Sequence, residues 1–64
     1  MEKTFIDAFS RLNAKRDIKS IMFLEYILTK YFHKNKFLMP MKEAMPFLER
    51  QDREQLATIL QEAF

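Results

Sequence analysis

The stretch that decides the fold is IKSIMFLEYILTKYF, residues 18–32. Its apolar residues recur at helical spacing and leave almost no side of a helix free for water. At about 100° per residue, one broad side of this helix carries most of the large apolar residues: Ile18, Ile21, Leu24, Leu28, Tyr31 and Phe32. We expect this side to form the core of the fold.

The same helix carries a second set of apolar residues. Phe23 and Ile27 lie on the opposite side, and Met22 and Tyr26 lie on a flank. One neighbouring surface cannot cover both sides of a helix. The stretch therefore predicts one of two arrangements: other helices surround it completely, or its second apolar surface remains for a partner.

The rest of the chain predicts three further helices. Glycine is absent from the 64 residues, although average usage would give about four, and this disfavours hairpin turns. We expect an all-α fold in a single domain over residues 1–64: a compact bundle of four short helices around the central hydrophobic second helix. The third helix, starting near Pro40, should be short or kinked because Pro46 interrupts it.

Capping residues set the expected helix boundaries. Thr4 and Asp17 are suitable N-caps for the first and second helices. Asn13 and Asn35 are the expected stops of those helices, because Asn tolerates the left-handed conformation where Gly is absent. Asp52, with a Gln three positions later, matches a capping box and predicts that the last helix begins there.

Length and composition restrict the class of protein. A chain of 64 residues with 48% hydrophobic residues can fold, but so small a domain buries only about 60% of its unfolded surface. The absence of Cys agrees with a reducing compartment. The N-terminal residues do not resemble a signal peptide, and no segment reaches the roughly 20 apolar residues of a membrane span. We therefore expect a cytoplasmic protein that does not enter a membrane.

Groups that could perform catalysis are scarce. The single His33 lies among Lys30, Lys34 and Lys36, and no nucleophile, base and partner stand at a recognisable spacing. Three Met residues within residues 39–45 follow helical spacing and are expected to pack in the core rather than bind copper(I). We expect no enzyme activity, no catalytic residue, no metal and no cofactor.

Protein binding is the expected function. Several large apolar side chains on one exposed surface are unusual for a soluble monomer and normally mark an interface. The predicted interface consists of Met22, Phe23, Tyr26 and Ile27. These residues predict a small non-enzymatic regulator or adaptor that inhibits or bridges a larger protein and self-associates as a homodimer. The sequence identifies no partner, and a structural subunit of a larger assembly is an alternative that it does not separate from a regulator.

Nucleic-acid binding is the alternative from a different class. Basic residues gather near both ends of the second helix, where they would contact phosphates: Lys15, Arg16, Lys19, Lys30, Lys34 and Lys36. The two groups are about 20 Å apart along the helix, with apolar residues between them. This spacing makes nucleic acid a weaker prediction than a protein partner.

Overall fold

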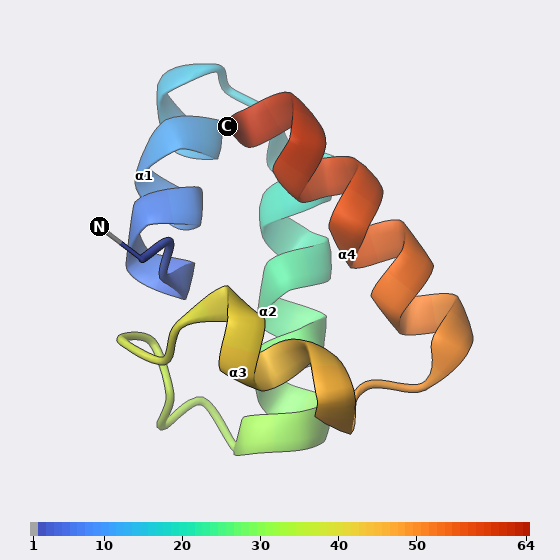
Figure 1. The fold of residues 1–64 in the computed structure, drawn as a ribbon. Helices are drawn as coiled ribbons and strands as arrows, with labels where there is room; N and C mark the ends of the chain where they lie inside the picture. Colours follow the sequence, from blue (N-terminus) through green and yellow to red (C-terminus); the bar gives the residue numbers. More distant parts are fainter. Residues whose placement is uncertain (1) are drawn as a thin grey trace.

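The computed structural model describes residues 2–64, which form a bundle of helices (Figure 1). In chain order the elements are α1 (Phe5–Ala14), α2 (Ile18–Phe32), α3 (Met41–Ala44), a 3₁₀ turn η1 (Met45–Phe47) and α4 (Arg50–Ala63). The predicted all-α bundle with a short third helix is confirmed. In Figure 1, α3 crosses in front of α2, while α1 and α4 lie on either side of it.

Two of the predicted N-caps are present. The Thr4 hydroxyl accepts a hydrogen bond from the Asp7 amide at 3.2 Å, and this bond starts α1. The Asp17 carboxylate accepts from the Ser20 amide at 3.3 Å and from the Ser20 hydroxyl at 2.9 Å at the start of α2. Each cap satisfies a backbone donor that has no partner within its helix.

The predicted stops of α1 and α2 were wrong. Residues with positive φ, rather than Asn13 and Asn35, turn the chain after these helices: Arg16 at 57°, His33 at 53° and Lys34 at 63°. The turn after α2 is fixed by the Lys34 amide, which donates to the Leu28 carbonyl at 2.9 Å. The left-handed residues therefore lie where the helical hydrogen bonds end, and the preference of Asn for this conformation did not determine their positions.

The capping box at Asp52 was also wrong, because α4 begins two residues earlier, at Arg50, with Glu49 as its N-cap residue. Asp52 lies in the first turn of α4 and its side chain bonds to α2 instead. The proline prediction succeeded: Pro46 lies in η1, where α3 has already ended after four residues.

The core is formed by residues from every helix, and most of its largest fully buried side chains come from α1 and α2: Phe5, Leu12, Leu24, Ile27, Leu28 and Leu56. The N-terminal segment is tied to the connection that precedes α3. The Ile6 amide donates to the Phe37 carbonyl at 3.0 Å, and the Met41 amide donates to the Lys3 carbonyl at 2.9 Å.

The expected orientation of α2 was wrong at two positions. Ile27 was assigned to the second apolar surface but is 0% exposed, and Ile18 was assigned to the core but is 60% exposed. These residues are nine positions apart and so point in opposite directions from the helix axis, at about 100° per residue. Only one of them can face the core. The observed rotation buries Ile27 and brings the Tyr31 hydroxyl to Asp52 on α4.

Candidate protein-binding surface

An apolar ridge runs along the side of α2 that faces away from the core. It consists of Ile18, Met22 and Tyr26, which are 60%, 63% and 42% exposed and are spaced four residues apart. Successive members of such a series are rotated by only about 40°, so their side chains follow one another along the helix. We call these three residues the α2 ridge.

The α2 ridge retains part of the predicted interface. Met22 and Tyr26 are exposed as expected, and Phe23 is half-buried beside the ridge, with its ring centroid 5.5 Å from that of Tyr26. Ile27 does not belong to the surface, because it is completely buried. Ile18 was missed. The spacing of four residues from Ile18 to Met22 to Tyr26 is the sequence signal that would have identified it.

The apolar surface continues from the ridge over the seam between α1 and α2. Ile21 and Phe9 are half-buried there and line a shallow hollow of about 270 Å³ together with Ser10 and Asn13. The Phe9 ring packs on the ring of Phe37 at 5.8 Å, and Phe37 is itself 39% exposed. A partner placed on the ridge would therefore find a second row of apolar groups beside it.

A polar cluster fixes the edge of the ridge next to α4. Asp52, which is 7% exposed, accepts hydrogen bonds from the hydroxyl of Tyr31 at 2.6 Å and from that of Tyr26 at 3.2 Å. Lys30 donates to Asp52 and to the Tyr26 hydroxyl, each at 3.1 Å, and the Tyr31 hydroxyl accepts from the Glu49 amide at 3.1 Å. Tyr26 is therefore held in place on the surface rather than left free.

These contacts shift the ionisation of the three principal groups. The hydrogen bond from Tyr31, followed by those from Lys30 and Tyr26, lowers the pKa of Asp52 below its ordinary value. Hydrogen bonds with Tyr26 and Asp52 raise the pKa of Lys30, and burial together with the bond to Asp52 raises the pKa of Tyr31. All three shifts favour a cluster with a charged carboxylate, a charged ammonium and a neutral phenol.

The basic residues of the nucleic-acid alternative do not form one surface. Lys30 is paired with Asp52 and Glu49, and Lys15 donates to the Glu62 carbonyl at the end of α4. The others lie before, on or after α2: Arg16 in the turn before it, Lys19 in its first turn, and Lys34 and Lys36 beyond its end. The structure keeps two separate basic groups, one at each end of α2.

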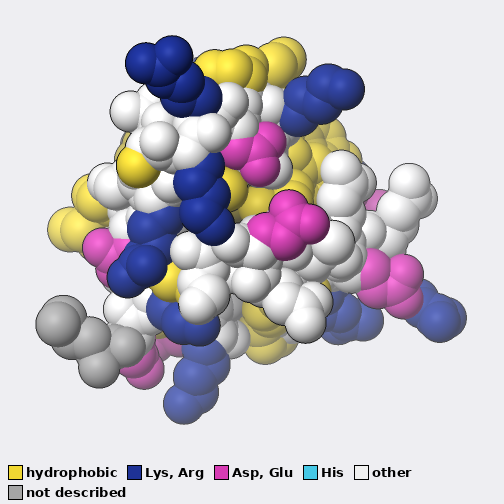
Figure 2. Space-filling view, turned by 90° about the horizontal axis from the view of Figure 1, so that it is seen from above, with side chains coloured by type: hydrophobic (Ala, Val, Ile, Leu, Met, Phe, Trp, Pro, Cys, Tyr) yellow, Lys and Arg dark blue, Asp and Glu magenta, His cyan; other side chains and the backbone are white. Residues whose placement is uncertain are grey.

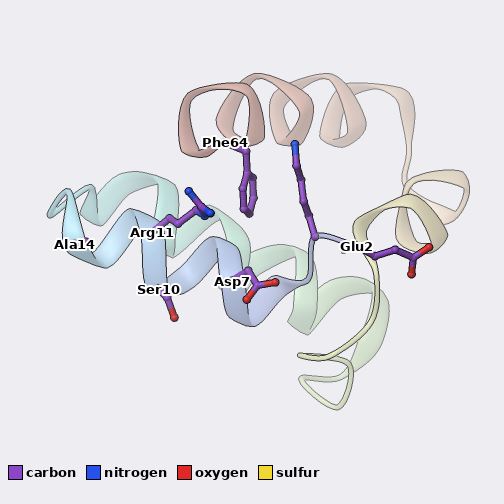
Figure 3. A pocket seen from close by; sticks show the side chains of 7 residues that line it. Glu2, Asp7, Ser10, Arg11, Ala14 and Phe64 are labelled. Atoms are coloured by element: carbon purple, nitrogen blue, oxygen red, sulfur yellow. The ribbon is translucent and has the colours of Figure 1, made fainter.

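A larger hollow than the one beside the ridge lies between α1 and the end of α4. It has a volume of about 520 Å³ and is lined by charged residues of both signs together with Phe64. In Figure 3 the Phe64 ring extends from α4 towards α1, next to Arg11. Arg11 and Lys3 each lie 4.8 Å from the centre of this ring.

Figure 2 views the molecule from above the orientation of Figure 1 and shows Lys and Arg side chains in a band, with Asp and Glu side chains beside them. Among the residues that line the hollow, Lys3 and Arg11 are balanced by Glu2 and Asp7. The cation–π contacts join α4 to α1, and they account for this arrangement without a ligand.

Within residues 2–64, no helix is long and apolar enough to cross a membrane. The same residues contain no group of three or more His, Cys, Asp or Glu side chains placed to hold a metal ion. Comparison of the chain with protein-family models, curated proteins and solved structures found no match.

Proposed function

We propose that this protein is a small cytoplasmic regulator or adaptor that acts without catalysis, by binding another protein through the α2 ridge. One observation supports this most strongly: Ile18, Met22 and Tyr26 are 60%, 63% and 42% exposed on a helix whose opposite side is core. Water in contact with large apolar side chains is unfavourable, and a partner that covered them would remove that cost.

The residue types of the ridge support a protein interface. Tyr and Met are enriched at the centres of interfaces, where the Met side chain adapts to irregular surfaces. Tyr26 is already held by Asp52 and Lys30 at 3.2 and 3.1 Å, so little side-chain entropy remains to be lost on binding. The ridge thus combines an adaptable centre with a fixed aromatic end.

Binding by this ridge would regulate by occlusion or by bridging. A chain of 64 residues that covers a groove on a larger protein denies it to other ligands. A homodimer formed through the same ridge remains a prediction and would bridge two such partners only if each copy kept a second surface free.

Replacement of Met22 by Asp tests the proposal. Because Met22 is 63% exposed, M22D should fold normally, yet a charge in the middle of the ridge should abolish binding. Phe47, which is 66% exposed on η1, supplies the matched control F47D. Proteins captured from the native host by the wild-type chain and by F47D should be lost with M22D. Capture of the same proteins by all three chains would refute the proposal.

A further inference from the structure

We infer that the segment bound by the α2 ridge is an acidic amphipathic helix. This inference rests on the proposed function and adds the chemistry of the partner. The charge of the residues near the ridge indicates an acidic partner. Residues 15–36 contain six Lys or Arg against two acids, Asp17 and Glu25. Asp17 is already engaged in capping α2, which leaves Glu25 as the acid of this segment that faces water without a hydrogen bond.

The positive charges are placed at both ends of α2. Arg16 and Lys19 flank Ile18 at one end, and Lys34 and Lys36 follow α2 at the other. All four side chains are exposed, and within residues 2–64 none of them forms an ion pair. Carboxylates on a bound segment would find these ammonium and guanidinium groups without displacing an existing partner.

The length of the α2 ridge matches about two turns of a bound helix. Ile18 and Tyr26 are eight residues apart, which is about 12 Å along α2, or roughly two helical turns. The neighbouring hollow between Ile21 and Phe9 runs beside the ridge and gives a docked helix a second row of contacts. The apolar side chains of an amphipathic helix, at positions such as i, i+4 and i+7, would pack against the ridge and over this hollow.

A second copy of the chain fits the charges less well. In an antiparallel pair of ridges centred on Met22, Lys19 of each copy would lie near Glu25 of the other, but Lys34 and Lys36 would extend past the partner's α2. In a parallel pair each basic end would meet itself. Like charges meet in the parallel pair, and the antiparallel pair leaves Lys34 and Lys36 without a carboxylate from the partner's α2, whereas an acidic helix as long as α2 meets opposite charge at both ends.

Nucleic acid fits less well for a different reason. A phosphate backbone requires cations that follow it along the surface. Here the two basic ends are separated by Ile18, Met22 and Glu25, which offer apolar groups and a negative charge.

The binding experiment uses two fluorescent peptides of about 14 residues, each a helix of about four turns. Both carry the same Leu stripe, and the remaining positions are mainly Glu in one peptide and mainly Lys in the other. By fluorescence anisotropy, the Glu peptide should bind the wild-type chain at least about tenfold more tightly than the Lys peptide. This preference should shrink as salt rises from about 0.01 M to about 1 M.

Variants test which residues produce the preference for the Glu peptide. K19E combined with K34E should remove the preference for the Glu peptide, whereas K42E, on α3, should keep it. M22D should abolish binding of both peptides, and F47D should bind as the wild type does. Circular dichroism of each variant confirms that the helices have formed.

Each contrary result has a distinct meaning. Equal affinity for both peptides, lost in M22D, would overturn the acidic partner and leave the ridge as a binding surface. Failure of both peptides to bind would overturn the inference, and the proposed function would also fail if capture from the host were unaffected by M22D. Tighter binding of a single-stranded oligonucleotide, or of vesicles of phosphatidylserine and phosphatidylcholine, than of the Glu peptide would assign the basic groups to phosphates instead.

Discussion

At the scale of single residues, this chain makes its left-handed turns without glycine. Arg16, His33 and Lys34 have φ values of 57°, 53° and 63°. A residue with a Cβ pays about 1–2 kcal/mol for this conformation. The surrounding hydrogen bonds, such as that of the Lys34 amide to the Leu28 carbonyl, hold the turn despite this strain.

Replacement of His33 by Gly should therefore stabilise the protein. Relief of the left-handed strain exceeds the extra entropy that Gly gives the unfolded chain, so we expect a gain of about 0.5–1 kcal/mol. Lys36 is a suitable control, because it does not have positive φ, and K36G should give no gain. Urea denaturation measures both. A loss of stability in H33G would contradict the assigned backbone conformation.

Asp52 should make stability depend on acid pH. Its folded pKa lies below the ordinary value because Tyr31, Lys30 and Tyr26 bond to the carboxylate. The stabilisation is complete above the ordinary pKa of Asp and is lost as pH falls through the lower, folded pKa. In Y31F, which removes the 2.6 Å bond, the decline of the urea midpoint on acidification should be shallower than in the wild type. Y26F, which removes longer bonds of 3.2 and 3.4 Å, should change it less. Equal decline in wild type and Y31F would show that this bond does not determine the pKa.

At the scale of elements, the sequence predicted the helices more reliably than their rotation. The spacing of apolar residues in residues 18–32 indicated a helix, and this helix is present as α2. The same spacing did not distinguish Ile18 from Ile27, since apolar residues occur on every side. The rotation depends on contacts with residues outside α2, which include the burial of Leu24, Ile27 and Leu28 in the core and the bond from Tyr31 to Asp52, 21 positions away.

Alanine substitutions on opposite sides of α2 test that rotation. Ile27 is 0% exposed, so I27A should create a cavity and destabilise the fold by about 2–5 kcal/mol. Met22 is 63% exposed, so M22A should change stability by no more than about 0.5 kcal/mol. Urea denaturation compares the two variants directly. Similar losses for both would mean that α2 is covered on all sides.

The seam between α1 and α4 makes a separate prediction. The Arg11 guanidinium lies 4.8 Å from the Phe64 ring centre. R11Q should lose this cation–π contact and about 0.5–1 kcal/mol of stability. R53Q changes a cation on α4 that has no contact with an aromatic ring among residues 2–64, and should have little effect. Thermal unfolding followed by circular dichroism distinguishes the two variants. Equal effects on stability would show that the cation–π contact does not stabilise this seam.

At the scale of the whole molecule, the number of elements limits how much surface can be covered. Three short helices pack around α2, but the side with Ile18, Met22 and Tyr26 remains exposed. Three of the four predicted interface residues lie on or beside this side, because the sequence shows their residue types and their spacing along the helix. Ile27, predicted on the surface, is buried, and Ile18, predicted in the core, is exposed. Their burial depends on where α4 packs, and the spacing of apolar residues within α2 does not determine this.

The binding role of the α2 ridge is tested most directly by NMR, by following the backbone amide chemical shifts of the isotope-labelled chain as the Glu peptide is added. We predict that the largest changes cluster at Ile18, Lys19, Met22 and Tyr26, with smaller ones at Phe9 and Ile21. Residues around Phe64 should stay unchanged. Shifts concentrated at Lys3, Arg11 and Phe64, with the ridge unaffected, would contradict the claim that the exposed side of α2 is the binding surface.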